Sequence, residues 1–274
     1  MPELPEVETI LTELQSSDIV GKKINAVRVF WPRTIATHAV EDFCQQIVHQ
    51  TIQSISRRGK YLVFTLSTHT LLVHLRMTGK FTLSRPPLEP RAHERVQLEL
   101  NDGRFLRYED QRKFGKWDLV VDPTEKLASL GLEPLSKAFT LTALKDLLQS
   151  HATQIKPFLL NQKYIAGLGN IYVDEALWEA KIHPKRAAQS LSFQEIKALH
   201  TAIPKVLHGG IAHMGTSLGS KNANYFSVSG RRGGNQHQLN VFRRDGLLCP
   251  RCQAPIQKIT LAQRGTHFCL HCQK

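Results

Sequence analysis

Four of the five cysteines stand within the last 26 residues, in two pairs with the spacing of a metal site. Cys249 and Cys252 form one C-x2-C pair, and sixteen residues separate it from the second pair, Cys269 and Cys272. Two such knuckles present four thiolates tetrahedrally to zinc. A site of four sulfurs leaves no open position for water, so we expect one structural zinc that performs no chemistry.

Alternative roles remain for the residues near this pattern. His267 and His271 flank Cys269 and could replace a cysteine as a ligand. Cys44 stands alone in a mixed segment, where a buried thiol is a better interpretation than a nucleophile. Five cysteines are too few for a disulfide framework in a chain this long.

A second candidate for chemistry is the amino terminus. Removal of Met1, which precedes the small residue Pro2, would expose a secondary amine. Because α-amino groups titrate near about 8, part of this amine is uncharged at neutral pH and can attack a sugar C1′. The cationic iminium that results would acidify the C2′ proton and permit elimination of the 3′ phosphate. Glu3 could move the protons, although acids in a first helical turn, such as Glu6, are usually caps.

The charge of the chain indicates an acidic partner. The 274 residues carry 36 Lys or Arg and 23 Asp or Glu, for a net charge of +13. Such a protein attracts a polyanion, either nucleic acid or an anionic membrane. No apolar stretch approaches 18 residues, and the first residues lack the order of a secretory leader, so we expect a cytoplasmic protein.

The first half of the chain reads as a helix followed by short strands. Val7, Ile10, Leu11 and Leu14 have helical spacing between Pro5 and Gly21. Runs rich in β-formers follow at 24–31, 61–66, 71–75, 96–100 and 104–108, the last two joined by a turn at Asn101-Asp102-Gly103. This pattern predicts a β-sandwich or barrel with one helix packed on it.

The second half reads as helical and then irregular. Helical runs are expected at 140–150, 154–165, 171–180 and 192–208, the last opened by a capping box of Ser192 and Glu195. We therefore predict an α+β fold with an N-terminal β-sandwich domain at 1–133, a helical domain at 134–238 and a zinc finger at 239–274. Residues 215–238 lack periodicity, and a loop this long is expected to contact substrate.

Six blocks in the chain resemble those of the bacterial formamidopyrimidine-DNA glycosylases, and they occur in the same order as in that family. They are Pro2-Glu3-Leu4-Pro5-Glu6, Arg57-Arg58-Gly59-Lys60-Tyr61-Leu62, His74-Leu75-Arg76-Met77-Thr78-Gly79, Arg107-Tyr108-Glu109-Asp110-Gln111-Arg112-Lys113-Phe114-Gly115, Gly167-Leu168-Gly169-Asn170-Ile171-Tyr172 and Gly265-Thr266-His267-Phe268-Cys269. Because the blocks span nearly the whole chain, the resemblance is specific. It implies a helix-two-turns-helix element in the helical domain and a β-hairpin zinc finger after it.

The resemblance also implies an activity and its catalytic residues. The family repairs DNA by base excision: it flips oxidised purines such as 8-oxoguanine from the duplex, cleaves the glycosidic bond and nicks the strand. Pro2 would then be the Schiff-base nucleophile and Glu3 the acid that assists sugar opening. Lys60 would serve β-elimination and phosphate contact, and Arg264 would assist δ-elimination. By residue type alone, both basic residues could be ordinary phosphate contacts or solvated cations.

The resemblance further implies how damaged duplex DNA is held. Met77, Arg112 and Phe114 would fill the space that the flipped nucleotide vacates. The remaining implied DNA contacts are His93, His151, Lys156 and Asn170, with Asn170 and nearby backbone amides gripping a phosphate. By residue type alone, Met77 and Phe114 would be core residues and His93 an exposed loop histidine. The implied protein is a monomer at the nucleoid, without an organic cofactor.

Departures from the family pattern keep two other interpretations open. Gln111 and Lys113 replace the usual residues around Arg112, and the usual acidic-aromatic pair is absent from residues 221–226. An endonuclease VIII-like enzyme for oxidised pyrimidines would use the same proline chemistry, although Leu4 favours the purine branch. A zinc-ribbon protein that binds DNA without catalysis is the second alternative, and the intact set of Pro2, Glu3 and Lys60 argues against it.

Overall fold

The computed structural model describes residues 1–86, 91–219 and 223–274. The chain forms two compact units, and each of them gathers segments that are far apart in the sequence. The first unit contains residues 1–128 and 213–236, and the second contains residues 129–212 and 237–274. No helix among the described residues is long and apolar enough to cross a membrane.

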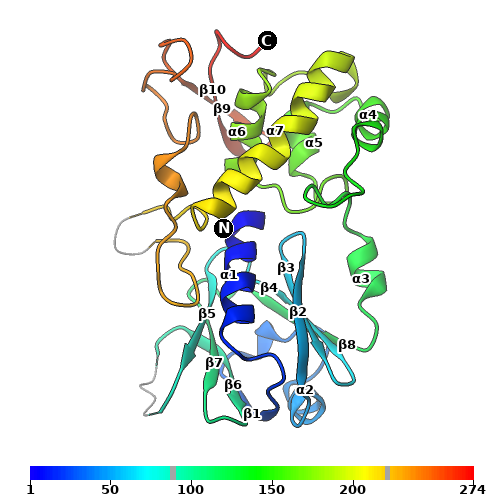
Figure 1. The fold of residues 1–274 in the computed structure, drawn as a ribbon, viewed down its shortest axis with the longest axis vertical. Coiled ribbons are helices and arrows are strands. Elements are labelled where there is room, and N and C mark those ends of the chain that lie inside the picture. The colour runs from blue at the N-terminus through cyan, green and yellow to red at the C-terminus, as the bar shows by residue number, and fades with distance from the viewer. Residues whose placement is uncertain (87–90, 220–222) are drawn as a thin grey trace. The chain divides into compact units, whose positions relative to one another are not determined.

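Two antiparallel four-stranded sheets form the first unit (Figure 1). Across each sheet the strand order is β1, β6, β7, β5 and β2, β3, β4, β8. The bounds are β1 Ile24–Val29, β2 Ile52–Arg58, β3 Tyr61–Leu66, β4 Thr70–His74, β5 Gly79–Ser84, β6 Glu94–Leu100, β7 Phe105–Asp110 and β8 Lys116–Val120. Aromatic rings join the two sheets: Phe81 and Tyr108 lie 5.8 and 5.4 Å from the ring of Trp117. The predicted sandwich is confirmed.

Helix α1 (Leu4–Ser16) packs on this sandwich through one apolar face. Val7, Ile10 and Leu14 are buried in the same core as the inward side chains of both sheets. Figure 1 shows α1 beside β2 and β3, which it contacts. Two short helices, α2 (Val40–Ile47) and α3 (Thr124–Ala128), and a 3-10 turn at Pro32–Thr34 are the other regular elements among the described residues 1–86 and 91–128.

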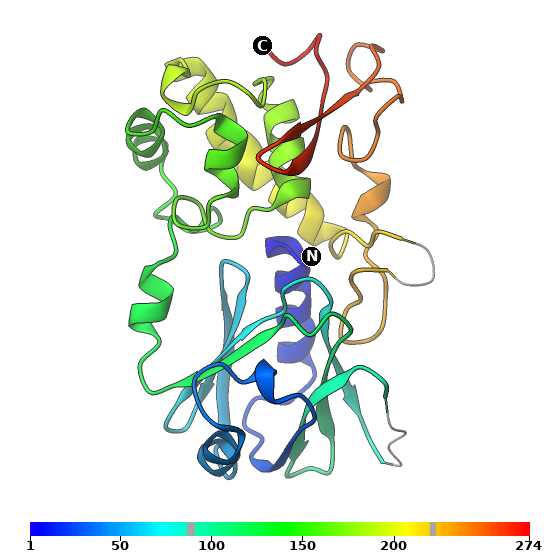
Figure 2. The ribbon, with the colours of Figure 1, turned by 180° about the vertical axis from the view of Figure 1, so that it is seen from behind.

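The second unit contains four helices and a hairpin. The helices are α4 (Leu141–Gln149), α5 (Ile155–Leu160), α6 (Asn170–Glu179) and α7 (Phe193–Ala212), with a 3-10 turn at Ala188–Ser190. A further 3-10 turn, Asn235–His237, lies where the chain passes from the first unit back to the second. The predicted capping box opens α7, because the Ser192 amide donates to the Glu195 carboxylate over 2.7 Å. Strands β9 (Gln257–Leu261) and β10 (Arg264–Phe268) form the hairpin, which contacts α6 and lies beside it in Figure 2.

Some segments differ from the sequence-based reading. The helix expected at 154–165 ends at Leu160, since the turn of residues 161–166 bonds back to Gly131 and Leu132. The irregular segment 213–236 groups with the sandwich because Tyr225 and Val228 are buried in the core of α1. The zinc finger groups with the helices because Trp178 of α6 packs against its cysteines. The division into three sequence domains at 133 and 238 stays a prediction, and residues 220–222 of the predicted loop lie outside the described residues.

Candidate functional site

The amino terminus is buried at the start of α1. Pro2 and Glu3 are both buried, and Glu3 is the N-cap residue of the helix. Glu6, one turn into α1, accepts the backbone N–H of Glu3 through Oε2 over 2.7 Å and that of Thr216 through Oε1 over 2.7 Å. One carboxylate therefore fixes the residue beside Pro2 and also anchors the segment that follows α7.

Lys60 stands in the tight turn between β2 and β3. Arg58 pairs with Tyr61, so Gly59 and Lys60 form a two-residue turn, and Gly59 has φ 57°, where glycine is favoured. Arg57 connects this turn to α1: its Nε lies 2.5 Å from Glu8 Oε2 and its Nη1 donates to the Gly59 carbonyl over 2.9 Å. The turn that carries Lys60 is thereby tied to the helix that begins beside Pro2.

The pKa of His74 in β4 depends in part on the positive charge around Lys60. Burial, together with the positive charges of Arg76 and Lys60, lowers the pKa of His74 to about 3. Its Nδ1 accepts the Arg76 N–H over 3.0 Å, which requires an unprotonated nitrogen. The ring is therefore neutral at physiological pH, and the cationic charge in this part of the unit belongs to lysine and arginine.

Met77, Arg112 and Phe114 lie together, from two different loops. Arg112 Nη1 is 2.8 Å from Met77 Sδ, and the Arg112 guanidinium carbon lies 4.9 Å from the centre of the Phe114 ring. Phe114 is 50% exposed, so it is not a core residue. Arg112 and Phe114 are exposed and Met77 is half-buried beside them, so the three side chains form a cluster that an opened base stack could receive.

Asp110 holds both loops of this cluster. Its buried carboxylate accepts the Thr78 hydroxyl, the Gly115 N–H over 2.7 Å and the Arg112 N–H over 3.2 Å. A side chain on Gly115 would lie only 1.7 Å from the Tyr108 hydroxyl, so glycine is required there. The loop that carries Arg112 and Phe114 is consequently fixed at both ends.

The departure at Lys113 has a structural counterpart. Lys113 has φ 60°, and its Nζ lies 4.0 Å from the centre of the Trp31 ring. A cation at this distance from the face of an indole is attracted to it by about 0.5–1 kcal/mol at an exposed site. Trp31 thus gives the loop a contact that a lysine can use.

A cavity of about 370 Å³ opens beside this cluster, within the range of ligand pockets. One wall comes from β5, β7 and their loops, and the other from residues 223–226. The predicted contact His93 is exposed at its rim, where its carbonyl accepts the Asp110 N–H over 2.8 Å. The lining residues are Thr78, Lys80, His93, Glu109, Gln111, Ala223, Asn224, Tyr225 and Phe226.

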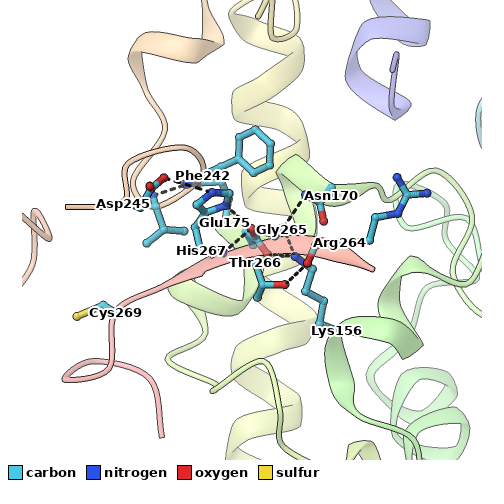
Figure 3. A network of polar contacts seen from close by, with 12 residues as sticks. Lys156, Asn170, Glu175, Phe242, Asp245, Arg264, Gly265, Thr266, His267 and Cys269 are labelled. Carbon is cyan, nitrogen blue, oxygen red and sulfur yellow. Dashed lines mark hydrogen bonds and ion pairs between the residues drawn. The ribbon is translucent and has the colours of Figure 1, made fainter. Parts of the chain in front are cut away.

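In the second unit, Lys156 is fully buried in a polar network at the hairpin (Figure 3). Its Nζ donates to Asp174 Oδ1 over 2.6 Å and to the Gly265 carbonyl over 3.0 Å. Asp174 Oδ2 accepts the His267 backbone N–H over 2.9 Å. The DNA contact of Lys156 stays a prediction; in the structure its ammonium bonds to protein groups and supports strand β10.

Asn170 of α6 bonds to strand β10, and Arg264 is the first residue of that strand. The Asn170 Nδ2 group donates to the Gly265 carbonyl over 2.9 Å, and its second hydrogen remains available. Arg264 is exposed at the start of β10, after a two-residue turn in which Ala262 and Gln263 have φ 47° and 59°. Figure 3 shows Asn170 and Arg264 on the same side of the network. The structure thus places the predicted phosphate contact Asn170 and the predicted catalytic residue Arg264 at the same strand.

His151 lies apart from this group. It is half-buried at the end of α4, with Nδ1 2.8 Å from the Leu147 carbonyl and its ring 4.2 Å from that of Tyr164. These contacts fix the His151 ring at the carboxyl end of α4. Its predicted DNA contact has no further support from its neighbours.

The four cysteines converge on one point. Their ligand atoms all lie within 4.8 Å of one another, with Sγ distances of 3.9 Å from Cys249 to Cys272 and 3.4 Å from Cys252 to Cys269. Tetrahedral zinc with Zn–S bonds of about 2.3 Å requires sulfur separations of about 3.8 Å, so the set fits zinc.

The surroundings of the cysteines also fit a structural metal. Burial and the neighbouring thiols raise the pKa of Cys272 to about 12, a cost that a bound cation would remove. His267 is not needed as a ligand, because its Nδ1 lies 3.1 Å from Asp174 Oδ2. Among the described residues, the four cysteines are the group that could hold a metal ion.

Sequence reasoning did not single out Arg57, Asp110 or Asp174. The signal available for Asp110 and Arg57 was their presence in blocks quoted for neighbouring residues. Asp174 had no comparable signal, because an acid on a helix is ordinarily solvated. Its burial and its contact with Lys156 emerge only from the packing of α6 against α5 and β10.

Three family sequence models match the chain in order. They are the formamidopyrimidine-DNA glycosylase N-terminal domain at residues 1–117, the formamidopyrimidine-DNA glycosylase H2TH domain at 130–222 and the zinc finger found in FPG and IleRS at 246–274. The formamidopyrimidine-DNA glycosylases of Protochlamydia amoebophila and Herpetosiphon aurantiacus are 47% and 46% identical to the chain, and each match covers both proteins completely.

Solved structures show the same similarity. A mutant of the Lactococcus lactis FPG protein, in complex with DNA containing Fapy-dG, superposes with a TM-score of 0.91 at 40% identity. A MutM protein in complex with DNA containing carbocyclic 8-oxo-G gives a TM-score of 0.90 at 40% identity. Both matches cover the whole of each chain.

Proposed function

Because this chain belongs to the formamidopyrimidine-DNA glycosylase family, we propose that it removes oxidised purines from duplex DNA and cleaves the strand through a Schiff base on Pro2. It is a DNA glycosylase of base excision repair that binds DNA and carries one structural zinc. The residue roles, the strand cleavage, the monomeric state and the action at the nucleoid are parts of the proposal. Its strongest support in the first unit is the buried start of α1, where Pro2 and Glu3 are adjacent.

The first step replaces the damaged base with the protein. The Pro2 nitrogen, freed by removal of Met1, bonds to C1′ while the bond from C1′ to the base breaks and the base leaves with a proton. Glu3 protonates the ring oxygen O4′ as the C1′–O4′ bond opens, which leaves an iminium cation. A carboxyl group held beside Pro2 by the bonds of Glu6 is suitably placed for this transfer.

The next steps break the DNA backbone. The iminium withdraws electrons and thereby acidifies the C2′ proton. A proton acceptor removes this proton, and the C3′–O bond breaks with loss of the 3′ phosphate. Lys60, in the turn that Arg57 ties to α1, supplies positive charge for that phosphate. Arg264, exposed at the start of β10, would assist the second elimination, which expels the 5′ phosphate.

Holding the flipped nucleotide is the role proposed for the remaining groups. Phe114 wedges the stack, Arg112 donates to the orphaned base, and Met77 fills the gap beside them. The cavity next to Met77 would take the everted base, with residues 223–226 as one wall. The network at Gly265 positions Asn170 and Arg264 toward phosphates.

The test is a panel of duplexes, each with one lesion. Untagged protein should release 8-oxoguanine and formamidopyrimidine opposite cytosine and leave nicked strands, while an undamaged duplex stays intact. Preferential release of dihydrouracil would favour the endonuclease VIII-like alternative. Tight binding without base release or nicking would favour a DNA-binding protein without catalysis.

A further inference from the structure

Two carboxylates of α1, two helical turns apart, accept hydrogen bonds from described residues of the segment 213–236. Glu6 and Glu13 are seven residues apart, so they lie on the same face of the helix. Glu6 accepts the Thr216 N–H near the beginning of the segment. Between the two attachment points, Tyr225 and Val228 are buried in the core that α1 shares with the sheets.

The second attachment is built on Glu13. Its carboxylate accepts three hydrogen bonds: from the Ser229 N–H over 2.8 Å, from the Ser229 hydroxyl over 3.0 Å and from Arg231 Nη2 over 2.9 Å. We call Glu13, Ser229 and Arg231 the Glu13 clasp. Burial raises the pKa of Glu13, but these hydrogen bonds outweigh it and leave the pKa below its ordinary value. The Glu13 carboxylate is therefore ionised at neutral pH.

The clasp closes a short turn that leads directly to the cavity wall. The Ser227 N–H donates to the Arg231 carbonyl over 2.9 Å, and the Gly230 N–H donates to the Ser227 carbonyl over 3.0 Å. Tyr225 and Phe226, immediately before this turn, line the cavity beside Thr78. The position of that wall therefore depends on where Glu13 holds residues 227–231.

We infer that Glu13 is a positioning residue that sets the 223–226 wall for base excision and is not needed for strand cleavage at a site without a base. This inference rests on the proposed function, in which the cavity takes the everted base. An abasic nucleotide has no base for that wall to contact. Loss of the clasp should therefore separate two activities that share Pro2, Glu3 and Lys60.

Glu13 allows this separation better than Glu6 does. Glu6 also accepts the Glu3 N–H, so a substitution there would disturb the residue beside Pro2. Glu13 lies two turns further along α1, and its carboxylate bonds to the 227–231 turn, through Ser229 and Arg231 and also through Ser227. A change at Glu13 therefore alters the wall without altering the chain terminus.

The experiment compares Glu13→Gln with the unsubstituted full chain on two duplexes. One contains 8-oxoguanine opposite cytosine, and the other contains a preformed abasic site at the same position. Excision under single-turnover conditions should fall about 10-fold, because a small misplacement of a binding wall has effects of this size, while nicking of the abasic duplex changes less than about 2-fold. Glu41→Gln, an exposed acid on α2 of the same unit, should change neither rate.

A second variant tests the same inference with a substitution that is less able to disturb the fold. Arg231 is 62% exposed on its side chain, so Arg231→Gln removes one arm of the clasp with little risk to the fold, and it should change the ratio of the two rates in the same direction. Equal rates of excision in Glu13→Gln and unsubstituted protein would overturn the inference, and so would an equal fall in both activities. If the unsubstituted chain failed to nick the abasic duplex, the proposed function itself would fail.

Discussion

Lys156 Nζ lies 2.6 Å from Asp174 Oδ1, and both side chains are buried almost completely. Such a pair contributes little net stability compared with apolar residues, but removal of one partner leaves an uncompensated buried charge. The pair also supports the hairpin, because Lys156 and Asp174 bond to Gly265 and His267 of β10. A lysine that the sequence suggested for DNA contact thus acts on the position of Arg264.

Replacing this lysine should affect stability and leave the salt dependence of binding unchanged. Lys156→Met removes a partner of buried Asp174 and should lower the free energy of unfolding by about 3–5 kcal/mol, measured by denaturant titration. A direct phosphate contact contributes about one unit to the slope of log affinity against log salt. Lys156→Met should keep the slope of the unsubstituted protein. A slope lower by one unit, with unfolding unchanged, would restore Lys156 as a DNA contact.

Phe114→Ala should reduce activity without reducing stability. The ring is half-exposed, so its loss should change the free energy of unfolding by about 0.5 kcal/mol or less. If the ring supplies about 1.4 kcal/mol toward opening the stack, excision of 8-oxoguanine slows about tenfold. Phe193→Ala removes a similarly exposed ring on α7 and serves as the matched control. Normal excision by Phe114→Ala would contradict the wedge.

Acid should destabilise the first unit through His74. The pKa of His74 is about 3 in the folded protein and near 6.5 when unfolded, so the unfolded chain alone binds this proton between those values. Stability from this group is complete above about pH 6.5 and is lost by up to about 1.4 kcal/mol per unit as pH falls toward 3.

The check is chemical unfolding from pH 7 to 4, compared with His74→Gln. The glutamine variant cannot take up this proton, so its stability should fall less steeply than that of the unsubstituted protein across the same range. Parallel curves for the two proteins would show that His74 carries no part of the pH dependence.

Removal of zinc should loosen the hairpin that carries Arg264. Trp178 is suited to report this, because its Nε1 lies 3.4 Å from Cys249 Sγ. Chelation should release one zinc per chain, change the Trp178 emission and reduce the second elimination more than the first. Trp178→Phe should lose the optical change but still release zinc. Full δ-elimination by protein shown to be free of metal would contradict a structural role.

Local sequence signals predicted much of the fold and the metal site. The runs of β-formers at 61–66 and 71–75, the turn at Asn101-Asp102-Gly103 and the capping box of α7 each depend on neighbouring residues, and the structure contains all of them. The cysteine spacing likewise defined four ligands that converge. Weaker elements, such as β2 and β5, were not predicted because polar residues interrupt their pattern of apolar ones.

Features that depend on packing between distant segments could not be predicted from the sequence. The irregular composition of 213–236 gave no sign that Tyr225 would enter the core of α1, more than two hundred residues earlier in the chain. In the sequence, Lys156 cannot be told from a solvated lysine, because its partner Asp174 comes from another helix, α6. The bond from the Thr78 hydroxyl to Asp110 similarly depends on the pairing of β5 with β7, which places Gly79 opposite Asp110.

The most direct test of the central claim is borohydride trapping on the Pro2 nitrogen. Untagged protein is incubated with a duplex carrying one 8-oxoguanine opposite cytosine, reduced, digested and analysed by mass spectrometry. The account predicts a covalent adduct on the N-terminal peptide at Pro2, absent from undamaged duplex and from protein with an uncleaved N-terminal tag. An adduct on Lys60, or base release with strand cleavage and no adduct, would contradict it.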